Sequence, residues 1–194
     1  MNRSGDENRS VRNTKRRLRD ALLRLMAEKP INEISVKELT EAVDVNRGTF
    51  YFHYSDVYGM LRSLEDDFFT QFDRILEQTP PPTGGPDAAY HYLTAIFAFL
   101  GENHDFCRVL LGENGDMKFV ERVKERVGEK CSYFWQRSAQ RTGPEGFALY
   151  NAFIIDGCVG VIRAWLNDGL RETPEEISRL AGTIILASVR SCIA

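Results

Sequence analysis

Apolar residues recur at spacings of three and four almost throughout this chain, and this periodicity is the feature that most limits its fold. One such stripe, formed by Leu18, Leu22, Leu25 and Met26, is typical of an amphipathic helix that ends at Pro30. No segment shows a convincing alternation of apolar and polar residues, which a half-buried strand would need. The sequence therefore predicts an all-α fold.

Helix-breaking residues divide this pattern into about nine predicted helices. Proline lacks the amide donor that a helix interior requires, and glycine is conformationally free. The breaks fall at Pro30 and at residues 80–86, 112–115 and 142–144. We predict helices over residues 13–28, 35–43, 46–53, 56–78, 87–102, 104–111, 116–140, 145–167 and 173–191.

Two of these helices, over residues 35–43 and 46–53, have the lengths and spacing of a helix-turn-helix. The first begins with the capping box Ser35-Val36-Lys37-Glu38, in which a hydroxyl and a carboxylate accept from amides at the helix start. Asp44 follows it in the turn, where Asp tolerates a left-handed backbone better than most other residues. The pattern predicts a small DNA-binding module.

The second short helix begins with residues suited to the major groove of DNA. Asn46 can cap it, and Arg47 offers a forked donor for guanine or phosphate. Gly48 removes a side chain where the backbone would approach DNA, and Thr49 can donate to a phosphate or touch a thymine methyl.

Aromatic residues make up the rest of this helix. Tyr51, His53 and Tyr54 carry ring donors that would meet the flanking DNA backbone. The alternative is that rings pack the core of the module, and we expect Phe50, Phe52 and Tyr54 to do so.

The segments Ile34-Ser35-Val36-Lys37-Glu38-Leu39 and Val45-Asn46-Arg47-Gly48-Thr49-Phe50-Tyr51-Phe52-His53-Tyr54 resemble the DNA-binding signature of the TetR family of transcriptional regulators. The resemblance implies that Arg47 and Thr49 face bases or nearby phosphates, that Tyr51 and His53 hold phosphates, and that Lys37 approaches the backbone. The expected DNA-binding residues are Lys37, Asn46, Arg47, Gly48, Thr49, Tyr51 and His53.

Two departures from the family pattern concern the turn of the motif and a phosphate contact. Asp44 stands where glycine is usual, and Val57 stands where the family commonly has a lysine that contacts phosphate. The basic run Lys15-Arg16-Arg17, with Arg19, offers a compensating contact to the DNA backbone. The alternative interpretation of that run is a solvated helix start.

Charge and length agree with a two-domain organisation. Residues 1–60 carry 11 Lys and Arg against 9 Asp and Glu, whereas residues 61–194 carry 14 against 19. We predict a flexible basic arm at 1–10, for which a merely solvated tail is the alternative. A helix-turn-helix domain follows at 11–60, and a helical regulatory and dimerisation domain at 61–194.

The last two predicted helices carry more apolar surface than one packed face needs, as a symmetric interface would require. Glycines among these residues would let another helix approach closely. The resemblance implies that they pair with their mates across a two-fold axis. The expected dimer residues are Phe153, Gly157, Gly160, Val161, Trp165, Ile177 and Ile184.

A ligand pocket is expected among the middle helices, lined by Phe97, Phe106, Phe134 and Trp135, although an aromatic stripe is more often core. His104 and Cys107 lack a visible third metal ligand, so we predict neither a metal nor a cofactor. The four cysteines form no CxxC pair and are expected to be inert core thiols.

These observations predict a homodimeric regulator, most simply a repressor, that binds a palindromic double-stranded DNA operator and leaves it when a small-molecule effector binds. One alternative is control by a protein partner, and another is a helical enzyme that does not bind DNA. No catalytic motif is present, so we expect no enzyme. Without an apolar run of about 20 residues or a secretory signal, no membrane association and a cytoplasmic location are expected.

Overall fold

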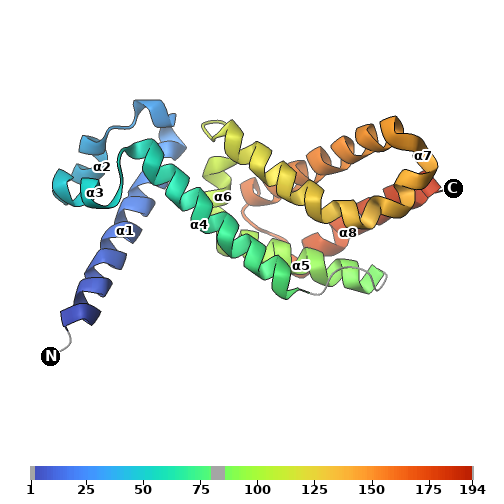
Figure 1. Cartoon of the computed structure of the whole chain (residues 1–194), viewed down its shortest axis with the longest axis horizontal. Helices are drawn as coiled ribbons and strands as arrows, with labels where there is room; N and C mark the ends of the chain where they lie inside the picture. Colours follow the sequence, from blue (N-terminus) through green and yellow to red (C-terminus); the bar gives the residue numbers. More distant parts are fainter. Residues whose placement is uncertain (1–2, 80–85, 194) are drawn as a thin grey trace. The chain divides into compact units, whose positions relative to one another are not determined.

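The computed structural model describes the backbone of residues 3–79 and 86–193. Side chains are described for the same residues except 3–8, 86–89, 127, 130–147, 150, 151, 186 and 188–193. Nine helices and no strand occur in this described part, which confirms the all-α prediction. They are α1 (Arg3–Glu28), η1 (Ile31–Glu33), α2 (Val36–Ala42), α3 (Arg47–His53), α4 (Val57–Gln78), α5 (Pro86–Glu102), α6 (His104–Leu110), α7 (Met117–Asn167) and α8 (Pro174–Ile193) (Figure 1).

The chain forms two compact units, which we call the N-terminal and the C-terminal unit. The N-terminal unit comprises Met1–Phe69 with Glu113–Gly115, and the C-terminal unit comprises Thr70–Gly112 with Asp116–Ala194. The helix α4 contributes residues to both units. The predicted domain limits at residues 10 and 60 stay predictions.

The core of the N-terminal unit is formed where α1, α2, α3 and the first turns of α4 present apolar side chains. Burying one such side chain contributes about 1.5–3 kcal/mol relative to leaving it exposed. The apolar side chains that are at most 2% exposed here are Leu18, Ala21, Leu22, Met26, Leu39, Phe50, Met60 and Leu61. This core fixes the two short helices against a longer one.

The first helix begins earlier than the sequence pattern predicted. It starts at Arg3 and not near Asn13, although the first buried side chain on it is Leu18. The apolar stripe marks only the part of a helix that packs, so polar turns before it escape this kind of prediction. The flexibility of residues 1–10 stays a prediction.

In the C-terminal unit α5 packs along α8, and α7 folds back on itself (Figure 1). Lys124 and Asp156, both on α7, form an ion pair of 2.9 Å. In a straight helix they would be about 48 Å apart, at 1.5 Å per residue. The chain therefore reverses between the two residues. We predicted two helices separated at 142–144, whereas the helical assignment runs through these residues.

A close approach of α5 and α8 explains one glycine of this unit. A Cβ atom built on Gly182 would lie 2.7 Å from Cε1 of Tyr90.

Thr173 and Glu176 begin α8 with a complete capping box, because each side chain accepts from the backbone amide of the other, at 3.2 and 2.9 Å. None of the described helices has both the length and the apolar character that a membrane span needs.

Candidate nucleic-acid interface

The first short helix of the motif, α2, is attached to α1 by its capping residues. The hydroxyl of Ser35 accepts from the amide of Glu38 at 3.2 Å. The carboxylate of Glu38 accepts from Nζ of Lys29, at 2.7 and 2.8 Å. This hydrogen bond is the main reason why the pKa of Glu38 is lowered. The carboxylate thus joins α2 to the end of α1.

The turn between α2 and α3 has the left-handed residue that the sequence predicted. Asp44 has φ 49°, and the amide of Val45 donates to the carbonyl of Thr40 at 3.0 Å. The guanidinium of Arg17 donates to the carbonyl of Val43, which ends α2. Backbone geometry and a side chain from α1 together set the direction in which α3 starts.

The first turn of α3 exposes polar groups to solvent. The side-chain oxygen of Asn46 accepts from the amide of Gly48 at 2.7 Å, which confirms the predicted cap. Asn46, Arg47 and Gly48 are exposed. A Cβ on Gly48 would meet only the Asn46 side chain, at an ordinary 3.4 Å. Packing within the protein therefore does not require this glycine.

Two rings hold α3 in the core while two others lie outside. Phe50 is fully buried and Tyr54 is 8% exposed, as predicted. Phe52 was predicted to be in the core, and this is wrong, since it is 81% exposed. Successive helical residues are about 100° apart, so Phe52 lies opposite Phe50. Tyr51 is 58% exposed, and its ring meets that of Phe50 edge-on at 5.6 Å.

His53 lies at the end of α3 between exposed and buried rings. Its ring is 5.0 Å from that of Phe52 and 6.2 Å from that of Tyr54. Desolvation lowers the pKa of His53, and the charge of Lys15 lowers it further. The imidazole is therefore mainly neutral at pH 7, and it can donate one hydrogen bond. Nζ of Lys15 is 5.9 Å from the Tyr54 ring centre.

Lys37 and Thr49 complete the predicted set of DNA-binding residues. The side chain of Lys37 is 62% exposed, and its ion pair with Glu41 is long, at 3.8 Å. Such an exposed pair contributes little and leaves the ammonium accessible. Thr49 is half-buried on α3. All seven predicted residues thus belong to α2, to α3 or to the cap of α3, within one compact unit.

The structure divides the predicted dimer residues into two groups. Phe153 is 70% and Ile184 is 50% exposed, and the glycines beside them are exposed as well. A Cβ on Gly157 or Gly160 would meet nothing within 4 Å. Val161 is half-buried. Leu149, which is 76% exposed, extends the same helix face and was not in the predicted set.

Trp165 and Ile177 must be withdrawn from the predicted dimer interface. They are 3% and 4% exposed within the chain itself, so a second copy cannot reach them. Nε1 of Trp165 donates to the carbonyl of Glu172 at 2.9 Å, and its ring meets that of Phe97 at 5.4 Å. A buried indole N–H needs such a partner, and the carbonyl of Glu172 supplies it.

Two of the predicted pocket residues are packed against other rings. Phe97 meets Trp165, and Phe106 meets Phe119 at 5.6 Å, so both are core residues of the C-terminal unit. The side chains of Phe134 and Trp135 lie outside the described residues. The ligand pocket therefore stays a prediction.

The described residues contain no group of three or more His, Cys, Asp or Glu side chains that a metal ion would need. Among the described thiols, Cys107 is buried, and burial raises the pKa of Cys158 to about 11. Its thiolate is therefore scarce at neutral pH.

Sequence reasoning missed three features of this interface. The helical period alone could have predicted that Phe52 is exposed, because Phe50 and Tyr54 mark the buried face of the helix. The Lys29–Glu38 pair and the Arg17–Val43 hydrogen bond join residues 9 and 26 positions apart. Contacts between different helices leave no periodic signal, and only the fold reveals them.

Family comparisons agree with this geometry. Residues 18–64 match the family described as "Bacterial regulatory proteins, tetR family", and residues 87–186 match its "Transcriptional regulator C-terminal region". The regulator YuxN of Bacillus subtilis (strain 168) is 28% identical over 108 residues, which are 55% of this chain and 36% of YuxN. The chain spans 36–42% of the length of the curated relatives it matches.

Solved structures show the same fold. A TetR transcriptional regulator from Streptococcus agalactiae 2603V is similar with a TM-score of 0.61 and 22% identity, covering 94% of this chain and 98% of that one. The dihydroxyacetone kinase operon activator DhaS is similar with a TM-score of 0.56 and 16% identity, covering 92% and 97%.

A helix-turn-helix with an exposed recognition helix, followed by a larger helical unit, defines a DNA-binding transcriptional regulator. This chain belongs to the TetR family of such regulators.

Proposed function

We propose that the chain binds a roughly palindromic operator as a homodimer and represses transcription there. The observation that carries this proposal is the exposure of Arg47, Gly48 and Tyr51 on α3, a helix that buried Phe50 holds in the core. A helix presented in this way fits the major groove, with its N-terminal residues at base edges.

Within this proposal each exposed group has a separate task. Arg47 donates its fork to a guanine edge or a phosphate, and Gly48 lets the helix backbone come close to the duplex. Tyr51, His53 and Lys37 hold phosphates, which fix the position of the helix without reading sequence. We add Phe52, whose 81% exposed ring is suited to apolar contact with a thymine methyl or a sugar.

A second copy supplies the second recognition helix. The face of α7 and α8 formed by Leu149, Phe153, Gly157, Gly160, Leu180 and Ile184 is exposed and carries no charge at these positions. Two-fold pairing through this face would present two α3 helices to half-sites one helical turn, or a multiple of it, apart.

The direction of regulation and its signal are also part of the proposal. The fold neighbour DhaS is described as an operon activator, so the fold does not determine the sign, and repression is our choice for this chain. We infer a small-molecule effector that binds the C-terminal unit and favours an arrangement that cannot bind DNA. The second candidate is control by a protein partner. Because the proposed target of this chain is bacterial DNA, we place the chain in the cytoplasm.

Selection of duplexes with the purified chain tests the proposal. Fragments bound from the source genome are expected to share two inverted half-sites, and a reporter placed behind such a site should be silenced. Tyr51→Ala should weaken binding of a recovered duplex roughly tenfold, as for a lost hydrogen bond to a charged group. Tyr51→Phe serves as its matched control for the ring contact with Phe50. Normal binding by both variants would contradict the placement of α3 in the groove.

A further inference from the structure

The start of α1 precedes the part of this helix that packs into the core of the N-terminal unit. Residues 3–17 precede Leu18, the first buried side chain of α1. The match to the tetR family also begins at residue 18. This part of the helix therefore precedes both the segment by which the family is recognised and the first side chain that α1 buries.

The described residues of this segment are strongly basic. Residues 9–19 contain Arg9, Arg12, Lys15, Arg16, Arg17 and Arg19 and no acidic residue. Two of these cations serve the module, since Arg17 donates to the end of α2 and Lys15 lies over the Tyr54 ring. Arg9, Arg12 and Arg16 are exposed, as are Lys15 and Arg17. We call the helix face that carries Arg9, Arg12 and Arg16, at spacings of three and four residues, the outward side.

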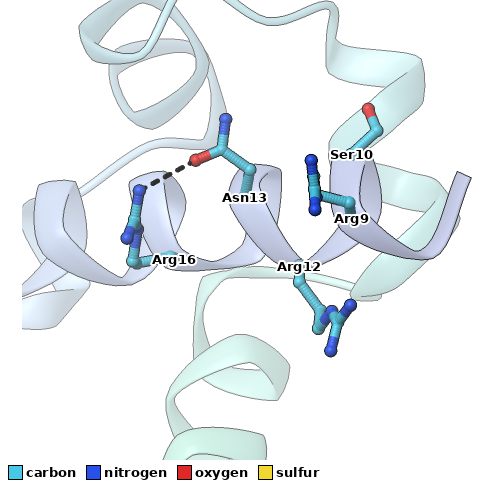
Figure 2. Close-up of a pocket in the computed structure, with 5 residues that line it drawn as sticks. All are labelled: Arg9, Ser10, Arg12, Asn13 and Arg16. Carbon is cyan, nitrogen blue, oxygen red and sulfur yellow. Dashed lines mark hydrogen bonds between the residues drawn. The ribbon is translucent and has the colours of Figure 1, made fainter. Parts of the chain in front are cut away.

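Figure 2 shows how the outward side is arranged. Arg9, Arg12 and Arg16, with Ser10 and Asn13, line a hollow of about 590 Å³ along α1. Nη2 of Arg16 donates to the side-chain oxygen of Asn13 at 3.1 Å. We call Arg9, Arg12 and Arg16 the arginine stripe, because spacings of three and four residues place them on one helix face.

The arginine stripe is unfavourable for an isolated helix. Like charges at these spacings each destabilise a helix by about 0.2–0.5 kcal/mol, and the stripe contains two such pairs. A polyanion lying along the stripe would remove this repulsion. Guanidinium groups fit phosphate oxygens, and Ser10 and Asn13 add neutral donors of the kind that also contact phosphates.

The dimensions suit a DNA strand. The stripe extends over eight residues, whose seven steps span about 10 Å of helix, and successive phosphates of one strand are about 3.4 Å apart along the duplex axis. Three arginines can therefore follow roughly three phosphates. A membrane surface is a poorer fit, because an interfacial helix needs a broad apolar face. Between residues 9 and 17 the segment has only Val11 as an aliphatic side chain.

We propose that Arg9, Arg12 and Arg16 form a second DNA contact, which binds the phosphate backbone outside the base pairs that α3 reads. This inference rests on the proposed function. The contact made by the arginine stripe adds affinity without adding sequence preference, since phosphates carry no base identity. The stripe also supplies positive charge in a chain whose α4 begins with the uncharged Val57, where the family commonly has a lysine.

The test compares two triple variants of the full chain on one duplex. The duplex is recovered by selection with the wild-type protein and has roughly 40 base pairs, which exceeds two half-sites one turn apart. R9Q/R12Q/R16Q removes the stripe. The control R108Q/R171Q/R179Q removes the same charge from exposed arginines of the C-terminal unit.

Fluorescence anisotropy at several salt concentrations measures the expected effect. Loss of three phosphate contacts should reduce the slope of log K against log salt by about 2.7 per protomer, and affinity should fall roughly tenfold or more. The control should keep the wild-type slope. R9K/R12K/R16K should also keep most of it, because lysine retains the charge. Thermal melting should show the stripe variant folded, since glutamine is a good helix former.

A shortened duplex separates the flank from the operator. With the flanking base pairs removed, the wild-type protein should bind no better than the stripe variant. An unchanged slope in R9Q/R12Q/R16Q, an equal loss in the control, or stripe-dependent binding to phosphatidylserine vesicles with normal DNA binding would overturn the inference. A wild-type chain that selects no duplex at all would instead contradict the proposed function.

Discussion

Two surfaces of this chain expose large apolar side chains, and they differ in what surrounds those side chains. On α3, Tyr51 and Phe52 lie beside Arg47 and the exposed backbone of Gly48. On α7, Leu149 and Phe153 lie beside Gly157 and Gly160, at helical spacing. Exposure alone is therefore ambiguous, and the neighbours indicate the partner: a charged polymer for the first surface and another helix for the second.

The largest expected effect comes from placing a charge on the second surface. Phe153→Asp should abolish the dimer, because the carboxylate would be buried in an apolar contact. With one recognition helix per molecule, operator affinity should fall by about a hundredfold or more. Sedimentation measures the mass, and anisotropy measures the affinity. Met117→Asp is the matched control, since Met117 is 68% exposed at the start of α7 and is not among the residues that form the proposed face. Equal behaviour of both variants would place the interface elsewhere.

Arg47→Ala tests how the first surface reads DNA. If Arg47 contacts a base edge, discrimination at one position of the operator should fall by about 1–3 kcal/mol. Thermal stability should not change, because the side chain is exposed. Affinities for single-base variants of the operator give the answer. A uniform loss across all sequences would assign Arg47 to a phosphate instead.

Gly48→Ala should change stability and binding in opposite directions. Alanine is the better helix former, by about 0.8–1 kcal/mol in a helix interior, and its Cβ would meet Asn46 at an ordinary 3.4 Å. The melting temperature should therefore rise slightly. Operator affinity should fall roughly fivefold because the added methyl holds the helix away from DNA, an effect of a size seen for one lost contact. Unchanged affinity would show that the backbone does not approach the duplex closely.

The smallest expected effect is a pH dependence from His53. Desolvation, and then Lys15, lower its pKa, so the free protein holds a neutral ring at pH 7. A phosphate beside the ring would raise that pKa, so that protons are taken up on binding. Operator affinity should rise roughly threefold from pH 8 to pH 6. If binding raised the pKa of His53 by one unit, the affinity could change about tenfold at most. His53→Gln should flatten this dependence, whereas Tyr51→Phe should retain it.

The same pKa shift has a consequence for folding. The pKa of His53 is lowered in the folded chain, so its contribution to stability is present above the unfolded value of about 6.5. It is lost as the pH falls through the lowered folded value. Melting curves of the free protein should therefore show that the wild-type chain loses more stability than His53→Gln on acidification.

Sequence reasoning succeeded where one residue or one helix determines the outcome. The caps at Ser35 and Asn46 and the left-handed turn at Asp44 depend on local chemistry. Sequence reasoning failed where packing against another helix decides which side chains are buried. Trp165 is apolar on an apolar helix, and only the position of α5 sends it inward toward Phe97. Periodicity shows which residues are apolar, whereas tertiary packing determines which of two apolar faces is covered.

The two capping boxes make the same point. Thr173 and Glu176 bond only to each other's backbone amides within their box, whereas Glu38 of the first box also accepts from Nζ of Lys29, just after α1. The sequence patterns are equivalent, and the nearby ammonium makes the difference.

The division of α3 into a buried and an exposed side has a consequence for divergence among such regulators. Phe50 and Tyr54 hold the helix in place, while Arg47, Gly48 and Phe52 face outward. Exchanges at the outward positions alter few contacts in the folded chain, so they should accumulate without loss of protein. A duplicated copy can therefore acquire a new target site in small steps, with its scaffold intact throughout.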